Sequence, residues 1–249
     1  MKVIAFSNQK GGVAKTTSTY NIGMALANIG KKVLMIDLDP QASLTIAVGI
    51  EPYDLEKSMA NVVNRSASIA DCVYEINSNL HIAVSTIDLA TEELNLISRT
   101  SREYILKRAI EPLKSVYDYI MIDCPPNLGT LTVNALTCAD GVIIPSETQY
   151  FSYRGIELLN NSIADIKELT NPDLEIYGYI ATKYQRTNKQ KEILEAMMKN
   201  YKVLGVCNLK NDTDKGVYDG VPVVEFNPNS DVAMEYVKIA NFINENYGE

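Results

Sequence analysis

The sequence predicts an α/β fold in which a mostly parallel, twisted β-sheet is covered by helices on both faces. Two observations predict it. Short apolar runs without polar alternation recur along the chain, which is typical of strands buried on both faces of a sheet. Each run is followed by a helical segment, the order that builds parallel sheets through crossovers. The expected strands are residues 3–7, 33–37, 80–85, 119–123, 141–145 and 175–181.

The helical segments lie between these strands and after the last one. Gly30 is placed to end the first helix, because glycine readily adopts the left-handed conformation found there. The sequence has no internal repeat and no linker rich in Pro, Gly or Ser, so we expect a single domain over residues 1–249. The expected helices are residues 16–29, 88–97, 101–117, 131–138, 151–169, 187–200 and 231–246.

Composition limits the classes of protein that the chain can be. Hydrophobic residues make up 46% and charged residues 22% of 249 residues, which excludes a wholly disordered chain and collagen. The net charge of −8 excludes a positive field over the whole protein. The four cysteines are not paired in a C-x-x-C motif and His81 is the single histidine, so a zinc site is not indicated.

The sequence also bears on location. The first residues lack the charged, apolar and small-residue pattern of a signal peptide. No apolar run approaches the roughly 18–20 residues that a membrane-spanning helix needs. We therefore expect a cytoplasmic protein with no membrane partner.

A glycine-rich segment between the first strand and the first helix predicts a phosphate-binding loop. It reads QKGGVAKTT over residues 9–17. Two glycines allow the backbone to approach a phosphate, Lys15 supplies a positive charge, and the Thr16 hydroxyl can bind Mg²⁺. The strict G-x-x-x-x-G-K-[ST] pattern is not met, because Gln9 and Ala14 stand at its two glycine positions. At this point a Gly-Gly turn that only opens a helix remains the alternative.

Aspartates end two of the other predicted strands. Asp37 and Asp39 follow the apolar residues of the second strand, and Asp123 ends the strand at residues 119–123. Ligands of open parallel sheets gather at the carboxyl ends of the strands, where Asp123 could bind Mg²⁺ through water. Either motif alone is common in turns. Together with the glycine-rich loop, the two motifs favour a nucleotide site.

These three segments resemble the motifs of the ParA/MinD family of deviant Walker A ATPases, which have a P-loop NTPase fold. KGGVAKTT is similar to the signature loop of the family, VLMIDLDPQ to its second motif and YIMIDCPP to its third. The likeness extends to VYDGVPVVEFNPNSD near the C-terminal end. It is strongest to the short, Soj-like ParA proteins of chromosome and plasmid partition.

The resemblance implies an ATPase that uses ATP and Mg²⁺. Its catalytic residues would be Lys10, Lys15 and Asp39, with Asp39 activating water and Lys10 reaching the nucleotide of a partner in an ATP-dependent homodimer. The implied magnesium residues are Thr16, Asp37 and Asp123. The residues implied to hold the nucleotide are Lys10, Gly11, Gly12, Val13, Ala14, Lys15, Thr16 and Thr17.

The resemblance also implies partners. An ATP-bound dimer would bind DNA nonspecifically on the nucleoid, and a ParB-like centromere-binding protein would stimulate slow hydrolysis during segregation. Residues 183–215 contain eight lysines and arginines against four acidic residues, a net charge of +4, while the rest of the chain carries −12. This segment is a candidate DNA-binding face, with a solvated helix face as the alternative.

Two other functions, each with its own sequence requirement, are the alternatives. A MinD-like switch on a membrane or other cargo would need a basic amphipathic C-terminal helix, but residues 237–249 have one lysine and two glutamates. A redox protein similar to the nitrogenase iron protein would need paired cysteines around a cluster. Cys72, Cys124, Cys138 and Cys207 do not resemble that arrangement.

Overall fold

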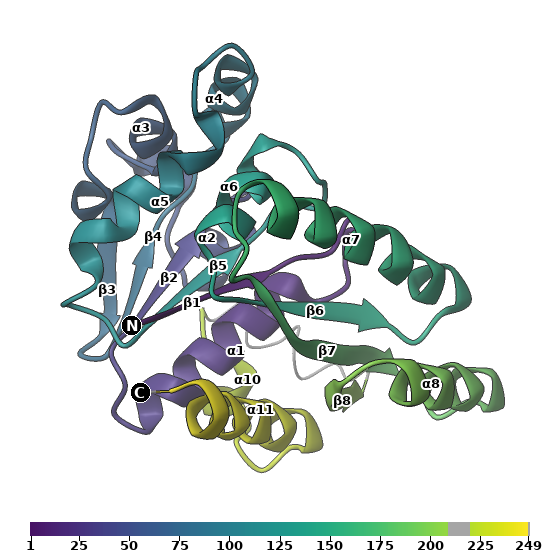
Figure 1. The fold of residues 1–249 in the computed structure, drawn as a ribbon. Coiled ribbons are helices and arrows are strands. Elements are labelled where there is room, and N and C mark those ends of the chain that lie inside the picture. Colours follow the sequence, from purple (N-terminus) through teal and green to yellow (C-terminus); the bar gives the residue numbers. More distant parts are fainter. Residues whose placement is uncertain (209–219, 249) are drawn as a thin grey trace.

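An eight-stranded sheet forms the centre of the computed structural model, which describes residues 1–208 and 220–248 (Figure 1). The strand order is β3-β4-β2-β5-β1-β6-β7-β8. β3 pairs with β4 in antiparallel orientation, and the other neighbouring strands are parallel. The strands are β1 Lys2–Phe6, β2 Val33–Asp37, β3 Val73–Asn77, β4 Leu80–Ala83, β5 Tyr119–Asp123, β6 Gly141–Glu147, β7 Glu175–Tyr184 and β8 Val203–Asn208.

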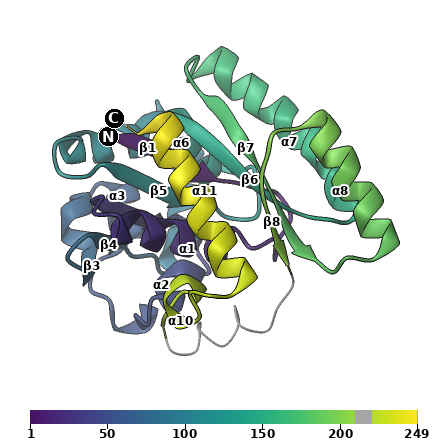
Figure 2. The ribbon, with the colours of Figure 1, turned by 90° about the horizontal axis from the view of Figure 1, so that it is seen from below.

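Helices cover both faces of the sheet, and each face has its own hydrophobic core. One core lies under α1, α2, α10 and α11, and α1 and α11 are seen in front of the sheet in Figure 2. The other core lies under α3 to α8. The helices are α1 Lys15–Asn28, α2 Ser43–Ala47, α3 Met59–Asn64, α4 Asp88–Leu96, α5 Ile105–Ile110, α6 Thr130–Cys138, α7 Tyr150–Leu169, α8 Asn188–Asn200, α10 Val223–Phe226 and α11 Asp231–Tyr247.

The continuous apolar runs are strands buried on both sides, as predicted. All five residues of β2 are buried; Leu34 and Ile36 pack into one core while Val33 and Met35 pack into the other. Successive side chains of a strand point to opposite faces, so a strand between two helical layers needs apolar residues at every position. The predicted α/β fold is confirmed.

The predicted helix over residues 101–117 is wrong. The segment consists of a 3₁₀ turn at Arg102–Tyr104, helix α5, and a second 3₁₀ turn at Glu111–Leu113. Pro112 lies in the second turn. A proline lacks an amide hydrogen and its ring clashes with the preceding turn of a helix, so α5 ends before it.

Two strands continue further than their apolar runs predicted. β6 continues past the expected residue 145 to Glu147, and β7 continues past residue 181 to Tyr184. The two strands stay paired to this point, with Glu147 beside Thr182. Polar residues therefore extend the sheet edge toward the glycine-rich loop.

The last helix packs as its periodicity predicted. Val232, Tyr236, Ile239, Ala240 and Ile243 of α11 are buried in the core that α1 shares. The apolar face of α11 is therefore used inside the fold. Within residues 1–208 and 220–248, none of the helices combines the length and the apolar character that crossing a membrane requires.

Candidate nucleotide-binding site

A pocket of about 500 Å³ opens at the carboxyl ends of the strands. Its volume lies in the range of small-molecule and cofactor sites. One wall is the glycine-rich loop with the start of α1, and Asp39 lies on the loop after β2. The opposite wall is formed by the ends of β7 and β8 and the start of α11. The lining includes Gly11, Gly12, Ala14, Lys15, Thr16, Thr17, Asp39, Thr182, Lys183, Asn208, Val232 and Tyr236.

The glycine-rich loop has a backbone suited to binding an anion. Gly12 and Ala14 have positive φ values of 74° and 67°, and α1 begins at the next residue, Lys15. Turns of this kind and a helix N-terminus both direct backbone amides toward one point. The order of strand, loop and helix that the sequence predicted is therefore present.

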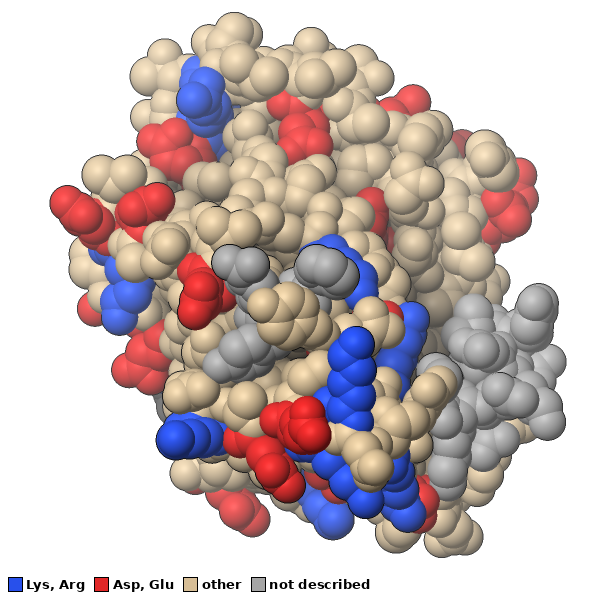
Figure 3. Space-filling view, turned by 90° about the vertical axis from the view of Figure 1, so that its right-hand side faces the viewer, with Lys and Arg blue, Asp and Glu red and all other residues tan. Residues whose placement is uncertain are grey.

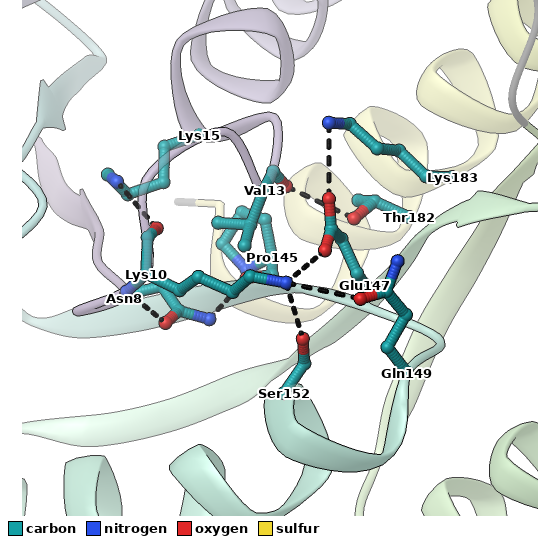
Figure 4. A network of polar contacts seen from close by, with 10 residues as sticks. All are labelled: Asn8, Lys10, Val13, Lys15, Pro145, Glu147, Gln149, Ser152, Thr182 and Lys183. Carbon is teal, nitrogen blue, oxygen red and sulfur yellow. Dashed lines mark hydrogen bonds and ion pairs between the residues drawn. The ribbon is translucent and has the colours of Figure 1, made fainter.

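Neighbouring strands hold this loop in place (Figure 4). The Asn8 side chain accepts a hydrogen bond from the Lys10 amide at 3.0 Å and donates one to the Pro145 carbonyl at 2.7 Å. The Thr182 hydroxyl donates to the Val13 carbonyl at 3.1 Å. The loop is thus attached to both β6 and β7 through side chains that the motif itself does not contain.

The two lysines of the loop point in different directions. Lys15 is buried and lines the pocket, with its Nζ 3.5 Å from the Lys10 carbonyl oxygen. Lys10 points away from Lys15 toward the end of β6, where it forms an ion pair with Glu147 and donates to Ser152 at 3.1 Å. Its side chain is 43% exposed. Lys15 can therefore serve this pocket, while Lys10 lies beside it.

Thr16 and Asp123 meet at the base of the pocket. The Thr16 hydroxyl donates to Asp123 Oδ2 at 2.6 Å, and the buried Oδ1 of Asp123 has no hydrogen-bond partner among the described residues. Burial, with a contribution from nearby Asp37, raises the pKa of Asp123 to about 8. A hydroxyl beside an unpartnered carboxylate oxygen is a suitable donor set for Mg²⁺ or its bound water.

Asp37 and Asp39 have different surroundings although they are two residues apart. Asp37 is fully buried; it accepts hydrogen bonds from the Asp39 amide at 3.2 Å and from the Thr45 amide and hydroxyl at 2.8 Å. Burial raises the pKa of Asp37 to about 6. Asp39 lines the pocket, where burial raises its pKa and Lys15 opposes that shift. Asp37 therefore holds the loop that presents Asp39.

The structure brings most of the predicted site residues to one place. Val13 is buried, and Asp37 and Asp123 lie beneath the pocket next to each other in the pairing of β2 with β5. Sequence reasoning missed Glu147 and Thr182, and it assigned Lys183 to the candidate DNA-binding segment rather than to this pocket. The only sign of these residues in the sequence is that polar residues follow the apolar runs of β6 and β7. Polar residues at these points do not show that the strands continue.

Comparisons with known proteins identify relatives of this chain. A family model described as an AAA domain matches residues 1–176. The sporulation initiation inhibitor protein Soj of Bacillus subtilis is 38% identical over 252 residues, which cover 98% of this chain and 99% of Soj. The chain belongs to the ParA/MinD family.

Two further similarities support membership of the ParA/MinD family. The chromosome partitioning protein ParA of Caulobacter vibrioides is 37% identical over 77% of this chain and 73% of its own length. A solved structure of a Mycobacterium smegmatis protein, described as cobyrinic acid a,c-diamide synthase, is 34% identical with a TM-score of 0.85, covering 100% and 97% of the two chains. That structure holds an ATP analogue and magnesium, the cofactors that the ParA/MinD resemblance implied.

Replacing Ala14 by glycine should stabilise the protein. The left-handed backbone at Ala14 is strained for a residue with a Cβ atom, and glycine removes that strain. We expect Ala14→Gly to raise the free energy of unfolding by about 0.5–1 kcal/mol in urea titrations without nucleotide. Ala25→Gly, inside helix α1, is the matched control and should lower it by about 1 kcal/mol. If the Ala14→Gly protein were less stable than the wild type, the backbone at Ala14 would not be strained as argued.

Replacing Asp123 by asparagine should stabilise the protein at high pH. The pKa of Asp123 is raised from 3.8 to about 8, so its contribution to stability is present below about pH 4 and is lost as the pH rises toward 8. Asparagine keeps an acceptor for Thr16 but carries no charge. We expect the stability of Asp123→Asn relative to the wild type, measured without Mg²⁺, to rise by about 4 kcal/mol from about pH 5 to about pH 8.5, at about 1.4 kcal/mol per pH unit.

The measurement is urea unfolding at both pH values. Asp173→Asn, at an exposed position, is the control. A gain for Asp123→Asn that is the same at both pH values would show that the buried charge is not its cause.

Proposed function

We propose that this chain is a Mg²⁺-dependent ATPase of the ParA type that segregates plasmids or chromosomes. ATP closes a homodimer, the dimer binds DNA nonspecifically, and a ParB-like centromere-binding protein stimulates slow hydrolysis. The similarity to Soj and ParA supports this proposal. Its main structural support is the different placement of Lys15, inside the pocket, and Lys10, beside it. Because β1 and β8 belong to one sheet, we treat residues 1–249 as one domain.

Each part of phosphoryl transfer has a candidate residue in the pocket. The amides of Gly11, Gly12 and Val13, with Lys15, would hold the phosphates, and Ala14 and Thr17 would complete the loop around them. Thr16 and Asp123 would bind magnesium, supported by Asp37 through the loop that it holds. Asp39 would position and activate the attacking water. Such sites act mainly by placing charge around the transferred group.

Lys10 is the residue that would join catalysis to dimer formation. Lys15 already supplies a positive charge to the nucleotide of its own subunit, and Lys10 is exposed near the pocket. A second subunit would bring another nucleotide within reach of Lys10. Two subunits with a net charge of −8 each repel, so contacts between a lysine and a phosphate across the interface would help offset that repulsion.

The candidate DNA-binding face lies at the end of the molecule that carries α8. Figure 3 shows Lys and Arg side chains gathered on this side, with acidic side chains among them. Lys210 and Lys215 of the predicted basic segment lie outside the described residues. Two such faces in a dimer would double the phosphate contacts and steepen the salt dependence of binding. Lys183 of the predicted segment instead lines the pocket and pairs with Glu147, so it is not counted in this face. The remaining described basic residues are Arg186, Lys189, Lys191, Lys199 and Lys202.

A DNA scaffold is favoured over a membrane for this switch. The apolar face of α11 is buried against the sheet and α1, so it is not free to enter a lipid surface. We therefore infer a cytoplasmic protein that associates with the nucleoid when it holds ATP.

Lys10→Ala tests the role of the dimer. We expect the variant to bind ATP, because Lys15 is intact, but to fail to dimerise on it and to lose hydrolysis, by at least about tenfold, together with DNA retention. Light scattering with ATP, followed by a DNA pull-down at several salt concentrations, measures both. Lys32→Ala, at an exposed lysine after α1, is the control. An ATP-bound Lys10→Ala dimer that still holds DNA would refute the role of Lys10.

Asp39→Ala should separate binding from hydrolysis. The variant keeps all phosphate contacts, and the Asp39 carbonyl can still accept its hydrogen bond from Ser85, so the loop stays attached. We expect ATP to remain bound, the dimer to persist, and hydrolysis to fall by about a hundredfold or more. Phosphate release and light scattering test this against Asp54→Ala, an exposed control. Hydrolysis at the wild-type rate would remove Asp39 from the mechanism.

A further inference from the structure

Three charged side chains meet beside the pocket: Lys10, Glu147 and Lys183. Glu147 lies between the two lysines (Figure 4) and binds Lys10 through Oε2 and Lys183 through Oε1, the latter at 3.1 Å. The Glu147 side chain is only 8% exposed; burial alone would raise its pKa, but the hydrogen bonds and the positive charges of both lysines together lower it. One carboxylate is thus shared by two ammonium groups, and the cluster keeps one excess positive charge.

Lys183 lies over the glycine-rich loop. It lines the pocket, and its Nζ is 3.8 Å from the point that a Cβ atom on Gly12 would occupy. Gly12 belongs to the part of the loop whose amides would face a phosphate. The Lys183 ammonium is therefore close to the place where the phosphates of a nucleotide would bind.

The backbone at Lys183 departs from a regular strand in a way that directs this side chain. Adjacent residues of a regular strand point to opposite faces, yet Thr182 and Lys183 both line the pocket. Lys183 has a φ of +53°, and the pairing of β7 with β8 is irregular between Ala181 and Tyr184. A left-handed lysine at a strand end costs energy, and such strain is found most often at functional sites.

We propose that Lys183 is a phosphate-binding residue of the nucleotide pocket and that it exchanges the Glu147 carboxylate for phosphate oxygens when a nucleotide binds. The proposal rests on the proposed ATP site. A polyphosphate carries more negative charge than one carboxylate, and a lysine on its flexible stem can move between the two. Glu147 would then be left with Lys10 alone and would hold it beside the pocket.

The experiment is calorimetric titration of ATP with Mg²⁺ into the full chain. We expect Lys183→Gln to weaken binding about tenfold, as for the loss of a charge-assisted hydrogen bond, and Lys183→Arg to retain most of the affinity. Lys167→Gln, at an exposed lysine of α7, is the matched control and should bind like the wild type. Unfolding curves without nucleotide check that each variant is folded. A Lys183→Gln protein with wild-type affinity would overturn the proposal.

A second background separates direct contact from an effect through Glu147. In Glu147→Gln, the carboxylate no longer competes for Lys183, so we expect ATP to bind at least as tightly as to the wild type. Adding Lys183→Gln to this variant should again weaken binding about tenfold. If the loss disappears in this background, Lys183 acts only by holding Glu147, and the proposal is wrong.

Lys15→Ala distinguishes this inference from the function on which it rests. We expect Lys15→Ala to lose tight ATP binding. If it binds ATP like the wild type, the assigned pocket itself is wrong, and both proposals fail. If Lys15→Ala loses ATP while Lys183→Gln does not, only the role of Lys183 is overturned.

Discussion

The position of β1 between β5 and β6 is the constraint on which the rest of this structure depends. Because these strands are parallel, the loop after β1 emerges beside Asp123 at the end of β5 and Glu147 at the end of β6. The hydrogen bond from Thr16 to Asp123 then ties the first turn of α1 to the sheet. A phosphate-binding loop becomes a nucleotide pocket only when such neighbours supply its walls, which is why ligands gather at this edge of a parallel sheet.

The pocket combines buried carboxylates with lysines. Asp37 and Asp123 are buried beneath it, where burial raises the pKa of both, and Lys15 and Lys183 line it. A magnesium ion with a polyphosphate complements both kinds of charge, because the cation offsets the carboxylates and the phosphates offset the lysines. Glu147 compensates part of the positive charge by pairing with Lys10 and Lys183.

Local sequence patterns predicted most of the fold. They failed where contacts between segments far apart in the chain determine whether a strand forms and where it ends. β2, β5 and α11 matched closely, because each has a continuous apolar pattern. The edge strand β3 was missed, since its half-exposed residues form no apolar run. β8 was missed too: its sequence VLGVCN contains a glycine, and it is a strand because it pairs with β7. The same long-range pairing extended β6 and β7 beyond their apolar residues.

The sequence by itself determined the loop, the strands that end in Asp37 and Asp123, and the family, because each rests on residues adjacent along the chain. Tertiary structure decided the rest of the site. Glu147 is 137 residues from Lys10, and Lys183 comes from a further strand, so only the strand order brings the three together. The strand pairing places Glu147 beside Lys10, and the left-handed backbone at Lys183 directs that lysine into the pocket. Neither has a short-range pattern in the sequence.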